Sequence, residues 1–311
     1  MRHWIGILLL LLLPGAVSAA PAQGPLQEFS RVAELTGPAD SPMAMPTDIA
    51  IGLRGRVYIV DSGNNRILCY SREGEYLFAF GVPGEGEGEL LAPVGITTAK
   101  DGSVLVADRG NKRIQIFDED GKFITSILTR TAERVATPVD VAVSRSGKHI
   151  YVTATKPLHQ ILVYGEKGGK SEAETTWGKP GSNLGEFRFP ATITVGSDNN
   201  VYIVDVFNSR VQVFRDTGGV LISIGSWGVT PGHLFRPKGI AINENGLIAI
   251  SDSYLGVIQL FNTDTKFQAV LGENSEFTHF TTPTGMVFDD AGRLYIAEML
   301  ANKVTVLQLK R

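Results

Sequence analysis

Residues 46–61, PTDIAIGLRGRVYIVD, set a pattern that recurs along this chain of 311 residues. Apolar runs that begin with a proline follow at steps of 47, 45, 52, 47 and 46 residues: PVGITT (93–98), PVDVAV (138–143), PATITV (190–195), PKGIAI (237–242) and PTGMVF (283–288). A second apolar run follows each of them, and a third comes after a polar hairpin. A period in the mid-forties, built from short β-rich runs, predicts a β-propeller with one four-stranded sheet per repeat.

The fold class predicted from this pattern is all-β, a six-bladed β-propeller whose repeats start near residues 46, 93, 138, 190, 237 and 283. A weaker fourth run ends the first five repeats, but the sixth stops after its third run, near Leu309. The segment RVAELTG (31–37) has the spacing of the missing run. We expect it to complete the last blade as its outer strand, which closes the ring and covers open strand edges.

The first nineteen residues differ in kind from the rest. Arg2 and His3 precede the apolar stretch IGILLLLLLP, and small residues follow up to Ala19. This order is typical of a secretory signal peptide, and an uncleaved membrane anchor is the alternative. We therefore expect a signal peptide at 1–19, one propeller domain at 20–311, no transmembrane span after cleavage, and an extracytoplasmic location, either periplasmic or secreted.

Composition limits the partners. Loss of Arg2 with the leader leaves 28 basic and 32 acidic residues, and a clustered positive field typical of nucleic-acid binders is not evident, so no nucleic-acid partner is expected. Cys69 is the only cysteine, which excludes an intramolecular disulfide. A monomer is expected.

The polar hairpins share a second motif, Asp-x-x-Asn-x-Arg followed by Ile or Val. It occurs in full at 61–67, 108–114 and 205–211. Together with the proline-led strands, it resembles the NHL repeat family of six-bladed propellers, in an exported, bacterial-type form, over residues 28–309. The third repeat departs from it with Ala154 in place of the Asp, and the fifth and sixth repeats keep it only in part.

The arginines of this motif, Arg66, Arg113 and Arg210, have two interpretations. Each can reach back to the carboxylate or to a backbone carbonyl and so fix its hairpin. Alternatively, they contact a ligand on the face where the loops between second and third strands and between successive repeats emerge. We call this the loop face. Lys238, the one charged residue directly after a leading proline, is a further candidate ligand-binding residue there, for an anion.

Four residues are candidate metal ligands. Asp48 and Asp140 lie two positions after the leading proline of repeats one and three, where oxygen ligands could hold Ca²⁺ or bind a ligand. His233 and His279 lie four residues before a leading proline and are expected on one rim, where Zn²⁺ is the alternative to simple turn capping. No cofactor is predicted. Trp177 and Trp227 are expected to pack between blades.

The function predicted is a non-catalytic scaffold that binds a protein, peptide or glycan on the loop face. Motifs for nucleophilic catalysis, zinc-dependent proteolysis or phosphate binding are missing from the sequence. The resemblance also implies an alternative, a metal-dependent lyase or lactonase-like hydrolase with its site in the axial channel. Animal NHL proteins, which combine the propeller with zinc-binding modules and can bind RNA, are a remoter comparison.

Overall fold

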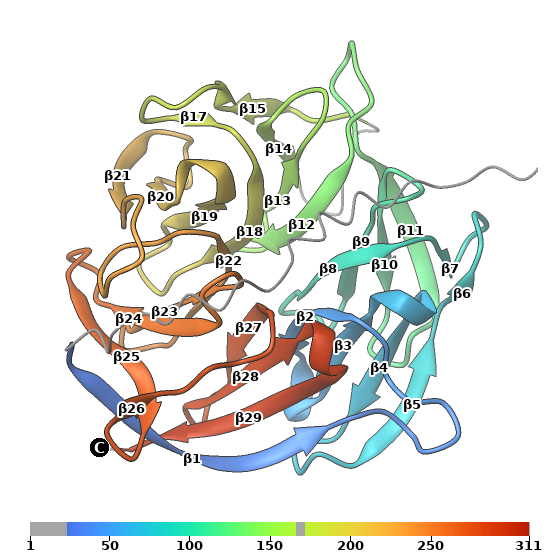
Figure 1. Ribbon diagram of the computed structural model, residues 1–311. Coiled ribbons are helices and arrows are strands. Elements are labelled where there is room, and N and C mark those ends of the chain that lie inside the picture. Colours follow the sequence, from blue (N-terminus) through green and yellow to red (C-terminus); the bar gives the residue numbers. More distant parts are fainter. Residues whose placement is uncertain (1–23, 166–171, 311) are drawn as a thin grey trace, which may run out of the picture.

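The computed structural model describes residues 24–165 and 172–310, so the predicted signal peptide at 1–19 lies outside the described residues. The described chain forms mainly antiparallel β-sheets arranged around a central axis, which is a β-propeller (Figure 1). The innermost strands all begin at a leading proline: β2 (Pro46–Ile51), β8 (Pro93–Thr98), β12 (Pro138–Val143), β18 (Pro190–Val195), β22 (Pro237–Ile242) and β27 (Pro283–Phe288). Each contacts the next inner strand, and β27 contacts β2.

Each inner strand pairs with a second strand, and the second with a third. The second strands are β3 (Val57–Asp61), β9 (Val104–Asp108), β13 (His149–Ala154), β19 (Val201–Asp205), β23 (Ile248–Asp252) and β28 (Arg293–Glu298). The third strands are β4 (Arg66–Tyr70), β10 (Arg113–Phe117), β14 (Gln160–Gly165), β20 (Arg210–Phe214), β24 (Val257–Phe261) and β29 (Lys303–Leu309). Most of their residues are buried, because each sheet is covered on both faces by its neighbours.

The outer strands are more exposed. They are β5 (Tyr76–Phe80), β11 (Phe123–Leu128), β15 (Thr175–Trp177), β21 (Val220–Ile224) and β25 (Phe267–Glu273). Two-residue strands lie in the connecting loops: β6 (Val82–Pro83), β7 (Glu89–Leu90), β16 (Lys179–Pro180), β17 (Glu186–Phe187) and β26 (Glu276–Phe277). Single 3₁₀ turns are η1 (Leu53–Gly55), η2 (Ser62–Asn64), η4 (Val206–Asn208) and η5 (Met299–Ala301).

The first strand, β1 (Leu26–Leu35), lies beside the last one. It pairs antiparallel with β29, from Phe29 opposite Leu309 to Leu35 opposite Val304. The sequence predicted this pairing, but its bounds of 31–37 were wrong. The strand begins earlier because residues 26–28 also pair in parallel with β25, and it ends before Gly37, whose φ of +87° makes a turn.

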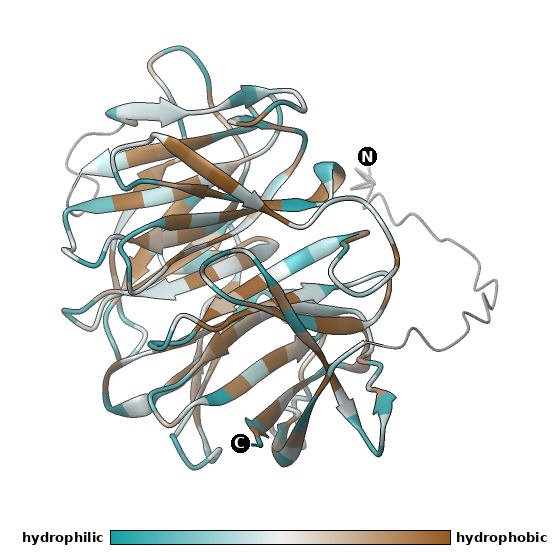
Figure 2. Ribbon diagram, turned by 90° about the vertical axis from the view of Figure 1, so that its left-hand side faces the viewer, coloured by the Kyte–Doolittle hydropathy of each residue, from teal (hydrophilic) through white to brown (hydrophobic). Residues whose placement is uncertain are grey.

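Apolar side chains from neighbouring sheets form the core, visible as brown strand segments in Figure 2. The cluster between the last and first sheets joins Ile59 and Leu68 to Ala297 and Val304, all fully buried. Burying each such aliphatic side chain stabilises the fold by roughly 1.5–3 kcal/mol. The two ends of the chain are therefore held together both by the β1–β29 ladder and by a shared core. Within the described ranges, no helix is long and apolar enough to cross a membrane.

Candidate functional site

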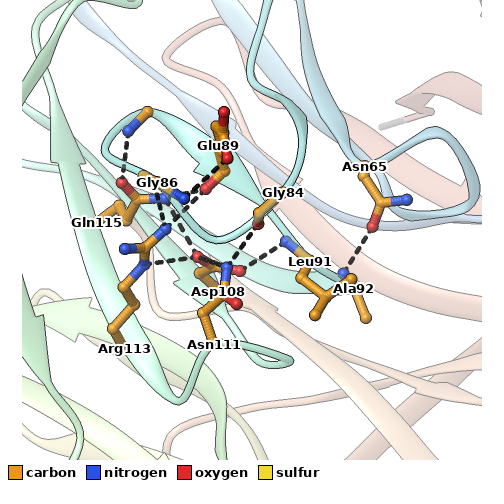
Figure 3. Close-up of polar contacts among 11 residues, drawn as sticks. Asn65, Gly84, Gly86, Glu89, Leu91, Ala92, Asp108, Asn111, Arg113 and Gln115 are labelled. Atoms are coloured by element: carbon orange, nitrogen blue, oxygen red, sulfur yellow. Dashed lines mark hydrogen bonds and ion pairs between the residues drawn. The ribbon is translucent and has the colours of Figure 1, made fainter. Parts of the chain in front are cut away.

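The β9–β10 hairpin shows what the Asp-x-x-Asn-x-Arg motif does (Figure 3). The buried Asp108 carboxylate accepts hydrogen bonds from Arg113 Nε at 2.8 Å, from Asn111 Nδ2 at 2.8 Å and from the Leu91 backbone N–H at 2.8 Å. Arg113 Nη2 also donates to the carbonyls of Gly86 (2.6 Å) and Glu89 (2.9 Å). The motif therefore ties its hairpin to the loop that precedes its own repeat.

The same arrangement recurs in the other complete motifs. Arg66 Nε donates to Asp61 Oδ2 at 2.7 Å and Arg210 Nε to Asp205 Oδ2 at 3.3 Å. The side chains of Arg66, Arg113 and Arg210 are only 13–15% exposed. All three predicted arginines thus fix hairpins, and a contact with ligand remains a prediction. The loops on this face are held rigidly, as a recognition surface requires.

Two of these buried aspartates also position aromatic residues. Asp205 Oδ1 accepts the backbone N–H of Phe189 at 3.2 Å. Asp252 has no arginine partner among the described residues. Its Oδ2 accepts the N–H groups of Phe235 (2.6 Å) and Arg236 (2.9 Å), and its Oδ1 accepts that of Tyr254 (3.2 Å). In the fifth repeat the carboxylate therefore organises the backbone beneath a group of large side chains.

Those side chains form a continuous surface on the loop face. Lys238 Nζ lies 5.7 Å from the Phe189 ring centre, and Phe189 packs against Phe207 at 5.3 Å. The Arg236 guanidinium lies 5.4 Å from the Phe207 ring and 4.8 Å from the Phe235 ring. Phe235 in turn packs against Tyr254 and Trp227, with ring-centre distances of 4.7 and 6.4 Å. We call this set the aromatic-cation patch: Phe189, Phe207, Trp227, Phe235, Arg236, Lys238 and Tyr254.

Three members of the patch are unusually exposed for aromatic residues. The exposed fractions are 52% for Phe207, 56% for Tyr254 and 70% for Trp227. The expectation that Trp227 packs between blades was therefore wrong, because its ring lies on the surface of the loop before β22. Trp177 does pack as expected: it is buried and stacks on Phe214. Exposed aromatic groups of this kind mark interaction sites.

Sequence reasoning selected Lys238 but missed the other members of the patch. One signal was present: the two residues after the strand-ending Asp are Ser-Gly and Arg-Gly in the first two motifs, but Val-Phe in the fourth repeat and Ser-Tyr in the fifth. Large aromatic residues at hairpin tips have no core to enter. Their placement at Phe207 and Tyr254 therefore indicated a surface role.

The predicted pair Asp48 and Asp140 lies at the axial channel. Both side chains line a cavity of about 190 Å³ between the inner strands, and both residues are buried. Asp48 Oδ2 accepts the Ile96 N–H at 2.9 Å, and Asp140 Oδ2 accepts the Ile193 N–H at 2.9 Å. Each carboxyl therefore links its own inner strand to the next one, and the two carboxyls also hydrogen-bond to each other.

Burial controls the protonation of this pair. Desolvation raises the pKa of Asp48 to about 7. Burial and, secondly, the charge of Asp48 raise the pKa of Asp140 well above its usual range. Two neighbouring carboxyls cannot both ionise cheaply, so the pair holds a proton near neutral pH. Glycine is required beside them, since a Cβ on Gly95 would lie 2.3 Å from Asp140 Oδ1.

The predicted histidines lie apart from this pair. His233 and His279 are exposed in loops on the loop face, as expected. His233 Nδ1 is 3.2 Å from Thr230 Oγ1, and His279 Nδ1 is 3.2 Å from the Leu255 carbonyl oxygen. In the part of the chain that the structure describes, no three His, Cys, Asp or Glu side chains are grouped so as to hold a metal ion.

Comparison with known proteins identifies the repeats. The family model described as NHL repeat matches residues 43–70, 90–117 and 187–214, which are the repeats with complete hairpin motifs. "Protein brain tumor" of Drosophila melanogaster is 29% identical over 163 residues, which is 52% of this chain and 15% of that protein. The chain thus spans a small part of the length of this relative.

Solved structures share the fold. A streptogramin B lyase matches with a TM-score of 0.64 and 16% identity over 91% of this chain and 98% of its own. A catalytically inactive virginiamycin B lyase from Staphylococcus aureus with quinupristin has a TM-score of 0.62 and 18% identity, covering 86% and 81%. A gluconolactonase from Xanthomonas campestris has a TM-score of 0.65 and 16% identity, covering 93% and 97%. At these identities, the likeness establishes the propeller fold alone.

Proposed function

We propose that this NHL-repeat β-propeller is an exported, non-catalytic scaffold that binds a macromolecular partner on its loop face. The observation that carries the proposal is the aromatic-cation patch, in which Phe207, Trp227 and Tyr254 are each more than half exposed. Exposing such rings to water is unfavourable, and aromatic and arginine side chains dominate the energy of interfaces. A partner that covers the patch would remove these rings from contact with water.

The rigidity of the loops supports the same proposal. The backbone N–H groups of four patch residues, Phe189, Phe235, Arg236 and Tyr254, are hydrogen-bonded to the buried carboxylates of Asp205 and Asp252. A partner therefore meets rings that are already in place, which reduces the entropy lost on binding. This is the arrangement expected of a docking surface rather than of a loop that closes over a substrate.

We infer six blades. The nine-stranded sheet contains two runs, β22-β23-β24-β25 and β27-β28-β29-β1, which join only where β1 passes from one to the other. Counting these runs as separate blades, beside the four sheets of four strands, gives one blade for each proline-led repeat.

The leader sequence supports export to the periplasm or the medium. Cell fractionation tests this proposal, and retention of the protein in the cytoplasm would contradict it.

An enzyme of the axial channel is the second candidate. Its support is the buried carboxyl pair, because a carboxyl whose pKa lies near 7 can serve as a general acid or base. The fold shared with lyases and a lactonase makes streptogramin B compounds and gluconolactone the substrates to test first. Saturable turnover that is lost on Asp48→Asn would replace the scaffold proposal.

The scaffold is tested by capture from the exported fraction with the folded protein as bait. We expect a retained protein that is lost with Phe207→Ser. Ile124→Ser is the matched control, since Ile124 is 54% exposed on the outer strand β11, away from the patch. Equal retention by both variants would show that the patch is not the binding surface, and circular dichroism verifies that both variants fold.

A further inference from the structure

The chemistry of the aromatic-cation patch identifies the kind of partner, an inference that rests on the proposed function. Arg236 and Lys238 are its two cationic members. In the described ranges, neither forms an ion pair within 4.0 Å, and the same holds for the exposed Arg109 and Arg188 nearby in the loops of this face. Among the other described arginines, nine pair with a carboxylate: Arg31, Arg54, Arg56, Arg66, Arg72, Arg113, Arg145, Arg210 and Arg293. Arg236 and Lys238 thus carry positive charge that no carboxylate of the described residues pairs with, in a protein with a net negative charge.

Lys238 is the most constrained of these cations. It is the second residue of the inner strand β22, and its ammonium lies against the Phe189 ring. Burial lowers the pKa of Lys238, and the charge of Arg109 lowers it further. An anion that interacts with both side chains would offset this mutual repulsion.

The cations against the rings and the free donors of Arg236 favour a carboxylate ligand over a sugar. The Arg236 guanidinium lies against Phe207 and Phe235, and Lys238 lies against Phe189. A sugar ring binds by stacking on an open aromatic face, and these three rings already have a cation against them. Arg236 uses one donor, Nη1, for the Phe235 carbonyl. Its remaining donors suit a carboxylate, which a guanidinium binds in a two-point arrangement.

The exposed rings supply the apolar half of the recognition. Tyr254 and Trp227 both lie against Phe235, with ring-centre distances of 4.7 and 6.4 Å to it. No cation lies over either ring among the described residues. The patch therefore offers carboxylate-binding groups beside uncovered aromatic surface in one continuous row.

We propose that the aromatic-cation patch binds an acidic peptide segment of a partner protein, with carboxylates against Arg236 and Lys238 and an aromatic or aliphatic side chain against Tyr254 and Trp227. Alternation of charge and apolar surface along the row matches an extended peptide with acidic and apolar residues interspersed. The salt dependence of the complex follows, since exposed charges are screened within about 10 Å at 0.1 M salt.

A peptide library tests this directly. A phage-displayed library of random dodecapeptides is selected on the folded protein, and the best sequences are synthesised together with versions in which every Asp and Glu is replaced by Asn and Gln. We expect enrichment of acidic residues next to aromatic ones. The amide versions should bind at least about tenfold more weakly, as expected when a charged hot-spot contact is removed.

Variants of the protein test whether Arg236 contacts the acidic residues of the peptide. Arg236→Gln should weaken binding by a similar factor. Arg72→Gln is the matched control, because Arg72 is likewise partly exposed but pairs with Asp290 on the opposite face. Peptides without acidic bias that still compete with Phe207-dependent capture would overturn the inference and leave the proposed function standing. Failure to select any peptide, or binding unaffected by Arg236→Gln, would also overturn it.

Discussion

Replacing Asp48 by asparagine tests the account of the axial channel. Burial raises the pKa of this carboxyl from 3.8 to about 7. A carboxyl whose pKa is raised on folding stabilises the fold when it is protonated, and this contribution is lost as pH rises towards the folded-state pKa. At 1.36 kcal/mol for each pKa unit, the shift makes the folded protein roughly 4 kcal/mol less stable above pH 7 than below pH 4.

Asparagine removes the charge and keeps the geometry. Its Oδ1 can accept the Ile96 N–H that Asp48 Oδ2 accepts now, and its amide can donate to Asp140. We therefore expect Asp48→Asn to match the wild type near pH 4 and to exceed it near pH 8 by roughly 2–4 kcal/mol, the range set by the coupling of the two carboxyls.

Urea unfolding followed by circular dichroism, at about pH 4.5, 6 and 8, measures this difference. Asp40→Asn, at an exposed position, is the control and should change stability by less than about 0.5 kcal/mol at every pH. If Asp48→Asn differed from the wild type by the same amount at all three pH values, the reasoning about the buried pair would be refuted.

Further predictions concern the hairpins, the ring closure and the surface. Asp108→Ala should destabilise the protein by about 3–5 kcal/mol, because it leaves the buried donors of Arg113 and Asn111 without their acceptor; the midpoint of thermal unfolding measures this. Deleting residues 24–35 uncovers the edge of β29 and should cause aggregation, which size-exclusion chromatography detects; a stable monomer would contradict the role of β1. Trp227→Ala should leave the unfolding midpoint unchanged while weakening partner binding, since 70% of this residue is exposed.

Much of the fold follows from local chemistry that a sequence displays. Proline lacks a backbone N–H and is tolerated at the first residue of a strand, so it marks the start of every inner strand here. The residue after the motif's Asn adopts the left-handed conformation expected at a tight turn, as in Asn65 with φ of +54°. The pairing of β1 with β29 was predictable because the last repeat visibly lacked a strand.

The site could be predicted only in part, because its contacts join residues from different repeats. That Asp48 and Asp140 meet depends on the closure of the ring and on Gly95 between them, which no local pattern specifies. The row from Lys238 through Arg236 to Tyr254 likewise brings together loops from neighbouring repeats. Trp227 was misjudged because an aromatic residue at the end of an apolar run is equally compatible with packing and with exposure.

Binding on the loop face is the central claim, and crosslinking mass spectrometry of the captured complex tests it most directly. We predict crosslinks from the partner to lysines of the loop face, Lys112, Lys179 and Lys238. Lysines of the opposite face, Lys122, Lys148 and Lys266, should remain unlinked. Crosslinks confined to this second group would contradict the claim.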